Sequence, residues 1–141
     1  MHLIHHQGDL FDCPYWVPIV HCVSYDGKMG AGIAKTVQSI FNVRSEFLAT
    51  EREVGGLVAV WRSHRFIVNL ITKLRYWHLP TLDSLQSSLR ALRSFVVDNN
   101  IGVLAMPEIA AGLDKIHLNL VIESLYQVFQ DLDIEIHMYH L

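Results

Sequence analysis

Short apolar runs alternate with amphipathic helical patterns along this chain, and that alternation limits its possible folds more than any other feature. Apolar runs of about four to eight residues between turn residues are typical of buried strands. Strands that alternate with helices build an α/β sheet, because each connecting helix packs back onto the sheet. Strands are therefore predicted at 2–6, 18–24, 57–62, 66–72, 103–106 and 134–139, with a tight turn at 63–65.

The clearest helix is predicted over 82–99. Thr81 stands directly before it and after Pro80, where the threonine hydroxyl can accept a hydrogen bond from a free amide of the first turn. The apolar residues of this segment recur at helical spacing and lie along one stripe. The stripe consists of Leu85, Leu89, Leu92 and Val96.

Three further segments have helical patterns. In 32–41, the side chains of Ile33, Val37 and Ile40 are predicted to share one face. The remaining helices are predicted at 44–53, stopped by Gly55–Gly56, and at 119–132, with Val121, Leu125, Val128 and Phe129 turned inward.

Neither a repeat nor a linker interrupts the 141 residues, so a single domain over residues 1–141 is expected. The lysines and arginines are scattered and the net charge is −3, so nucleic-acid binding is not expected. No apolar run is long enough to cross a bilayer. Cys13 and Cys22 are too few for a disulfide framework, which favours a reducing compartment, the cytoplasm or the nucleus. With no coiled-coil pattern, a monomer is expected.

Nine histidines raise the question of a metal site. None of them belongs to an HxxxH helix or stands beside a cysteine pair at zinc spacing. We therefore expect no metal, and interpret the histidines as scattered surface or partly buried side chains.

Loops that follow strands are the candidate binding segments, because ligands of open α/β sheets bind beyond the carboxyl ends of the strands. The loop 24–34, SYDGKMGAGIA, runs from a buried strand through three glycines into a helix. Glycines let the backbone approach a ligand closely, and the free amides of a helix start can bind phosphate. A plain strand-to-helix turn explains the same pattern.

A second glycine-containing loop, PEIAAGLD at 107–114, follows the short strand 103–106. Two such loops side by side would hold a pyrophosphate between them, with Asp114 at the rim. Asp9, which follows the first strand, has the position to accept a hydrogen bond from an adenine amino group. The alternatives are a solvated capping role for Asp114 and a turn role for Asp9.

Lys73 ends the apolar strand 66–72. Partial burial there would favour the neutral amine, which is the nucleophilic form. The alternative is a lysine whose ammonium reaches into water. The next residues, RYWH at 75–78, are either a loop that folds over a substrate or a packing loop with Trp77 in the core.

Taken together, these residues resemble the macro-domain family, and within it the branch of the terminal ADP-ribose protein glycohydrolases. The resemblance covers nearly the whole chain, and its specificity comes from the order and spacing of several motifs. It implies a three-layer α/β/α sandwich with a central mixed sheet. The motifs are GDLF at 8–11, HCVS at 21–24, MGAGIA at 29–34, LITK at 70–73, MP at 106–107, GLD at 112–114 and the ending at 139–141.

The resemblance implies ADP-ribose as the ligand and ADP-ribosylated proteins as partners, with no cofactor. Asp9 and the Leu10 backbone would bind the adenine, with Tyr139 and Leu141 near it. Ser24 would line the pocket. The diphosphate and distal ribose would lie between Met29, Gly30, Ala31, Gly32 and Ile33 on one side and Pro107, Ile109, Ala110, Ala111, Gly112 and Leu113 on the other.

The resemblance also implies an activity, the hydrolysis of ADP-ribosyl esters. The esters are mono-ADP-ribosyl glutamate or aspartate on proteins, and O-acyl-ADP-ribose. Lys73 would attack the anomeric C1″ of the distal ribose, and Asp114 would act as acid and base. Two alternatives are a phosphatase acting on ADP-ribose 1″-phosphate and a non-catalytic reader of ADP-ribose.

One loop departs from the family pattern. Where the family sequence is closer to IGCGLD, this chain has IAAGLD at 109–114. An alanine at Ala110 or Ala111 restricts the backbone wherever a positive φ is required, which would weaken phosphate binding.

Overall fold

The computed structural model describes residues 1–141 and contains one six-stranded sheet. The strands are β1 (His2–Gln7), β2 (Ile19–Ser24), β3 (Leu57–Arg62), β4 (Arg65–Lys73), β5 (Val103–Pro107) and β6 (Glu135–His140). Their order across the sheet is β1-β6-β5-β2-β4-β3. Every neighbouring pair is parallel except β3 with β4, which confirms the expected mixed sheet.

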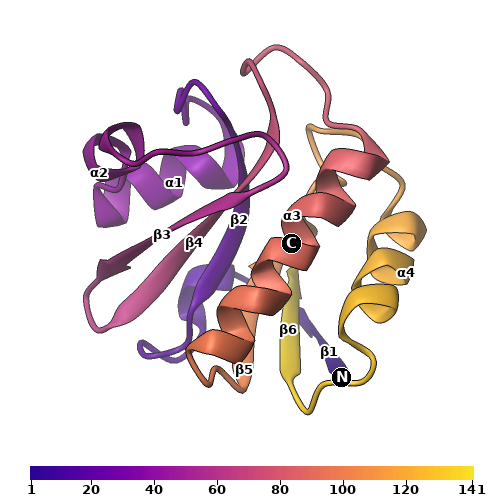
Figure 1. Cartoon of the computed structure of the whole chain (residues 1–141). Coiled ribbons are helices and arrows are strands. Elements are labelled where there is room, and N and C mark those ends of the chain that lie inside the picture. Colours follow the sequence, from indigo (N-terminus) through magenta and orange to yellow (C-terminus); the bar gives the residue numbers. More distant parts are fainter.

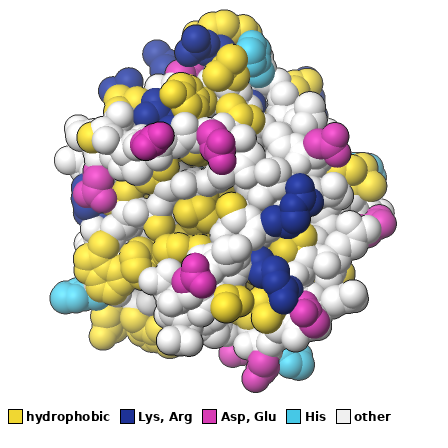
Figure 2. All heavy atoms as spheres, in the orientation of Figure 1, with side chains coloured by type: hydrophobic (Ala, Val, Ile, Leu, Met, Phe, Trp, Pro, Cys, Tyr) yellow, Lys and Arg dark blue, Asp and Glu magenta, His cyan; other side chains and the backbone are white.

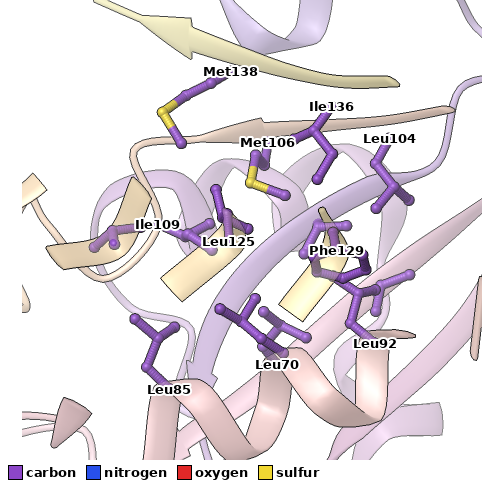
Figure 3. Packing of buried hydrophobic residues seen from close by; sticks show 14 of the residues in the cluster. Leu70, Leu85, Leu92, Leu104, Met106, Ile109, Leu125, Phe129, Ile136 and Met138 are labelled. Carbon is purple, nitrogen blue, oxygen red and sulfur yellow. The ribbon is translucent and has the colours of Figure 1, made fainter. Parts of the chain in front are cut away.

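Helices cover both faces of this sheet, as a three-layer sandwich requires. They are α1 (Gly32–Phe41), α2 (Arg44–Ala49), α3 (Leu82–Asp98) and α4 (Leu118–Phe129), and a 3-10 turn, η1, spans Leu10–Asp12. Figure 1 shows α1 close to α2, and α3 and α4 together elsewhere on the sheet. The core accordingly has two parts, one that includes the buried side chains of α1 and α2, and one that includes those of α3 and α4. In the second part, strand residues such as Leu70, Leu104 and Met106 pack with Leu85, Leu92, Leu125 and Phe129 (Figure 3).

The start of α3 follows the sequence-based prediction closely. The Thr81 hydroxyl accepts a hydrogen bond from the Ser84 backbone amide at 3.0 Å, and the Ser84 hydroxyl accepts one from the Thr81 amide at 3.1 Å. This reciprocal pair satisfies two amides that have no partner within the helix. All four residues of the predicted stripe are buried against the sheet and α4.

The inward face of α1 differs from the prediction in one residue. Val37 is buried and Ile33 half-buried, as expected, but Ile40 is 54% exposed. Phe41, one turn after Val37, takes the inward place instead, because the helix turns the side with Val37 and Phe41 toward the core. The equivalent prediction for α4 is confirmed at Val121, Leu125 and Phe129, whereas Val128 is only half-buried.

The second helix ends earlier than predicted, at Ala49 and not at 53. Thr50 adopts an extended backbone, and its hydroxyl donates to the carbonyl of Glu46 at 2.7 Å. The guanidinium of Arg52 then donates to the carbonyls of Leu48 and Thr50, and to Tyr25 at 3.0 Å. The bonds to Glu46, Leu48 and Thr50 satisfy carbonyls that a longer helix would have paired internally.

The predicted hairpin of β3 and β4 is present, with a turn of two residues. Ser63 and His64 have φ of 51° and 69°, and two consecutive positive values match the right-handed twist of hairpin strands. Arg65 therefore already belongs to β4, where it is buried and donates to the carbonyls of Pro14 and Val17.

Histidines of the first and last strands lie side by side, so they are not scattered as the sequence had suggested. Nδ1 of His5 is 2.7 Å from Nε2 of His140, and Nε2 of His6 is 2.7 Å from Nδ1 of His137. The parallel pairing of β1 with β6 brings these histidines together, although His5 and His140 are 135 residues apart in the sequence. Among the described residues, no three His, Cys, Asp or Glu side chains are placed to hold a metal ion. None of the helices has the length and apolar character needed to span a membrane.

Shortening a side chain of the α3 stripe should destabilise the protein far more than shortening an exposed one on the same helix. Leu92 is fully buried, whereas Val97 is 52% exposed. Leu92→Ala should lower the free energy of unfolding by about 2–5 kcal/mol, because the cavity adds to the lost burial. Val97→Ala should change it by less than about 0.5 kcal/mol. Urea titrations would measure both, and equal losses would contradict this account of the core.

Candidate active site

A cleft of about 600 Å³ lies at the carboxyl ends of β2, β4 and β5. These three strands are neighbours and run parallel, so the loops that follow them must meet at one edge of the sheet. The lining comes from the end of β2, the loop 28–34, Lys73, the residues Tyr76 to Leu79, and the loop 107–115. Both glycine-containing loops predicted to meet therefore face the same space.

The loop before α1 offers unpaired backbone amides to the cleft. Ala31 is the N-cap of α1 and makes no side-chain capping bond, so the first amides of the helix lack a partner. Gly32 has a φ of +57°, and a Cβ added there would come within 3.3 Å of Leu113 in the facing loop. Glycine at this position thus permits both the turn and the close approach of the two loops. Free amides at a helix start form an anion site.

The facing loop contains the alanine that departs from the family pattern. Ala110 has a φ of +59°, a left-handed backbone that glycine adopts more readily, whereas Ala111 has no positive φ. The Ala110 carbonyl accepts from the amide of Ile116 at 2.9 Å, and its side chain is buried. Ala110 thus adopts the left-handed backbone that a glycine would adopt without strain, and Lys115 in the same loop also has a positive φ, of 64°.

Lys73 and Asp114 form an ion pair inside the cleft. Nζ of Lys73 donates to Oδ1 of Asp114 at 2.7 Å, and the two side chains are 15% and 17% exposed. The lysine comes from the end of β4 and the aspartate from the loop after β5. Neither a lysine extended into water nor a solvated capping aspartate describes this geometry. The pair places a potential nucleophile and a potential proton acceptor at one point.

The side chains of β2 that reach the cleft are uncharged. Burial, followed by the nearby Asp114 carboxylate, raises the pKa of the Cys22 thiol to about 12. Burial lowers the pKa of His21 to about 4, against a smaller opposing effect of its hydrogen bond to Asn69 at 2.6 Å. A neutral surrounding of this kind strengthens the electrostatic influence of the Lys73–Asp114 pair on a ligand.

The predicted adenine-binding residues lie outside the lining of the cleft. The Asp9 carboxylate accepts from the backbone amide of Phe11 at 2.9 Å, as a turn aspartate does, and Leu10 is buried in the core. Tyr139 stacks on His6 at 4.6 Å between ring centroids, and Leu141 is 93% exposed. Of the other predicted ligand residues, Ala111 alone is absent from the lining, which includes Ser24, Met29, Gly30, Ala31, Gly32, Ile33, Pro107, Ile109, Ala110, Gly112 and Leu113.

Several lining residues were not singled out from the sequence. Glu108 accepts from Nδ1 of His140 at 2.7 Å, which ties the 107–115 loop to the last strand. Only the pairing of distant strands reveals this contact. Trp77 is 65% exposed at the mouth of the cleft, so the packing alternative for the 75–78 loop is wrong. Trp77 itself belongs to the loop 75–78, which the sequence had indicated as a candidate to fold over a substrate. The remaining additions are His21, Cys22, Val23, Lys28, Leu79 and Lys115.

Solved structures that share this architecture include macrodomains. The macrodomain of Thermus aquaticus DarG gives a TM-score of 0.87 at 20% identity and covers 97% of both chains. Thermosipho africanus DarTG, solved in complex with ADP-ribose, gives a TM-score of 0.84 at 20% identity, over 98% of this chain and 42% of that one. The fold is thus that of a macro domain.

Sequence comparison narrows the class further. The human ADP-ribose glycohydrolase OARD1 is 39% identical over 135 residues, which are 96% of this chain and 89% of that protein. An ADP-ribose 1″-phosphate phosphatase of Aspergillus fumigatus is 28% identical over 102 residues, 72% of this chain and 44% of that protein. No family model matches the chain. The chain belongs to the macro-domain family, in the ADP-ribose glycohydrolase branch that includes OARD1, which confirms the resemblance inferred from its motifs.

Neither cysteine should react quickly with a thiol reagent while the protein is folded. Burial raises the pKa of both thiols, that of Cys22 to about 12, so almost no reactive thiolate is present at pH 8. Ellman's reagent should therefore detect little thiol in the native protein and both thiols in guanidinium chloride. A rapid reaction of one equivalent with native protein would show that Cys22 is not desolvated.

Acid should weaken the fold through His21. Its native pKa of about 4 lies below the value of about 6.5 for an unfolded chain, so between these values the unfolded state binds the proton more readily. The contribution of neutral His21 is complete above about pH 6.5 and falls as the pH drops toward 4, by up to about 3 kcal/mol. Urea titrations at pH 7 and pH 4.5 would measure it. His21→Gln should show a smaller loss between these pH values, and an identical loss would assign the effect to other groups.

Proposed function

We propose that this protein hydrolyses ADP-ribosyl esters, with Lys73 as nucleophile and Asp114 as acid and base. The substrates are mono-ADP-ribosylated glutamate or aspartate on proteins, and O-acyl-ADP-ribose. The observation that carries the proposal is the 2.7 Å contact of the two side chains within a cleft between two glycine-containing loops. The 39% identity to an ADP-ribose glycohydrolase supports the same reaction class.

The binding energy for such a substrate would come mainly from its diphosphate. The free amides at the start of α1 face it from one side, and the 107–115 loop, held close by the contact of Gly32 with Leu113, faces it from the other. Interactions with this distant part of the substrate position C1″ next to Lys73, which lowers the entropic part of the barrier. The adenine roles of Asp9, Leu10, Tyr139 and Leu141 remain proposals, since these residues lie beyond the cleft lining.

The chemical step begins with a proton transfer inside the ion pair. An ammonium bonded to a carboxylate has no lone pair, so we propose that substrate binding separates or desolvates the pair and that Asp114 takes the proton. The Lys73 amine then forms a bond to C1″, and the C1″–oxygen bond breaks as the acyl carboxylate leaves. Asp114 gives its proton to the leaving carboxylate, then moves a proton from the bonded nitrogen to the ring oxygen as the adduct opens to a Schiff base with the sugar. The Asp114 carboxylate is then ionised again. Water, deprotonated by Asp114, adds to it, and release of ADP-ribose restores Lys73.

The second candidate is a phosphatase acting on ADP-ribose 1″-phosphate, because a relative with that name shares 28% identity over most of this chain. A phosphatase would place its leaving phosphate in the same cleft. It would release inorganic phosphate and would not depend on a lysine nucleophile. A non-catalytic reader would bind ADP-ribose and release nothing.

Lys73→Ala should abolish turnover and leave the affinity for ADP-ribose nearly unchanged. The truncation removes the nucleophile, whereas the diphosphate contacts are made by other residues. The assay is the release of free ADP-ribose from a glutamate-linked ADP-ribosylated protein, and calorimetry gives the affinity. The matched control is Lys35→Ala on the exposed side of α1, which should retain the wild-type rate.

Each competing function gives a different result in the same pair of measurements. Undiminished turnover by Lys73→Ala would refute the proposed nucleophile. Release of phosphate from ADP-ribose 1″-phosphate, with no action on the ester, would favour the phosphatase. Tight binding of ADP-ribose by the wild-type protein, with no product released, would favour the non-catalytic reader.

A further inference from the structure

The loop between β4 and α3 exposes an unusual group of apolar side chains. Leu74, Tyr76, Trp77 and Leu79 are 44%, 53%, 65% and 59% exposed, although they stand within six residues of one another. Isolated exposed apolar residues are ordinary on protein surfaces, but a contiguous group beside a cleft marks an interaction site. Figure 2 shows hydrophobic, basic and histidine side chains gathered at the top of the view, where Figure 1 places this loop.

This exposed loop is held in a defined shape. The Tyr76 backbone amide donates to Oδ2 of Asp26 at 3.0 Å, and the His78 amide donates to the Arg75 carbonyl at 3.0 Å. The Trp77 ring packs edge-on against the rings of Tyr76 and His78, with centroids 5.1 and 5.4 Å apart. Because the apolar groups are fixed before any partner arrives, little ordering entropy opposes their binding.

The loop lies where the acceptor polypeptide of a conjugate must run. It follows Lys73 directly, and Tyr76 to Leu79 form the mouth of the cleft. A cleft of about 600 Å³ has the size of a small-molecule site. The cleft would hold the nucleotide, and the polypeptide bonded to C1″ would lie on its rim. Leu113, 71% exposed, is a further apolar residue of the cleft lining, in the 107–115 loop.

The charges around this mouth favour an anionic partner. Lys28, Arg75 and Lys115 are exposed there, and the Lys28 amine lies 5.4 Å from the centre of the Tyr76 ring. The acidic groups nearby are already engaged. The Ser24 hydroxyl and two backbone amides donate to Asp26, Lys73 donates to Asp114, and His140 donates to Glu108. The chain as a whole carries −3, so the positive rim is a local feature.

We propose that the loop 74–79 docks the acceptor polypeptide, and that it selects an acidic segment with an apolar side chain next to the ADP-ribosylated residue. Trp77 and Leu79 would contact the apolar side chain, while Arg75, Lys28 and Lys115 would attract the acidic residues. The inference rests on the proposed function for the position of C1″, and it assigns the specificity of that site. A single-stranded nucleic acid is the less favoured partner, because such strands require a continuous basic groove.

The test measures the affinity of an intact conjugate, so it does not depend on turnover. The probe is a synthetic peptide with ADP-ribose linked to glutamine, an amide analogue of the ester, flanked by aspartates and one leucine. A second peptide carries serine in place of the leucine, and free ADP-ribose is the reference ligand. The proteins are wild type, Trp77→Ala and the control Trp61→Ala. Trp61 is 54% exposed on β3. It pairs with Phe66, which lies at the opposite end of β4 from Lys73, so Trp61 is far from the cleft.

The leucine conjugate should bind the wild-type protein about tenfold more tightly than free ADP-ribose, as expected for one aromatic anchor. Trp77→Ala should remove most of this advantage and change the affinity for free ADP-ribose less than about twofold. The serine peptide should bind the wild-type protein more weakly than the leucine peptide. Trp61→Ala should behave as wild type with every ligand.

Three results would overturn the docking proposal. The first is that the leucine conjugate binds no more tightly than free ADP-ribose. The second is that Trp77→Ala weakens the binding of both ligands equally. The third is that the affinity for an ADP-ribosylated oligonucleotide depends on Trp77 more than the affinity for the peptide does. Failure of the proposed function gives a different pattern. In that case the ester-linked conjugate is not cleaved, while the affinity differences between conjugate and free ligand persist.

Discussion

The parallel pairing of β2 with β5 on one side and β4 on the other is the constraint on which the site depends. It brings three carboxyl strand ends to one edge, and residues 41 positions apart in the sequence then meet as Lys73 and Asp114. β2 is buried along nearly its whole length, because helices cover both faces of the sheet. Any shift of β2 would therefore move both walls of the cleft and separate the ion pair.

Much of the fold follows from local patterns that need no knowledge of the rest of the chain. The stripe of α3, its Thr81 cap and the hairpin of β3 and β4 are of this kind, since periodicity and turn chemistry specify them directly. The errors arose where two patterns compete locally. Ile40 and Phe41 are adjacent and both apolar, and only packing selects Phe41. Carbonyl bonds from Arg52, which no pattern signals, accompany the early end of α2.

The candidate site was predictable in its strand-end loops but not in its boundaries. Lys73, Asp114 and the two glycine-containing loops converge as their positions after strands indicated. The bond from Glu108 to His140 and the positions of His21 and Cys22 depend on which strands become neighbours, and the sequence does not state that order. The left-handed backbone at Ala110 shows a further limit, because an alanine there adopts a conformation that its residue type disfavours.

The edge formed by β1 and β6 has a consequence for the direction of its hydrogen bonds. A carboxylate only accepts, so Nδ1 of His140 carries the hydrogen that reaches Glu108. In the tautomer that donates from Nδ1 alone, His140 accepts at Nε2, and Nδ1 of His5 is then the donor between the two rings. The row of contacts runs from His5 through His140 to Glu108, in the loop that forms one wall of the cleft. The outermost strand of the sheet is thereby joined by side-chain contacts to one wall of the cleft, so a change at the edge of the sheet can reach the ligand site.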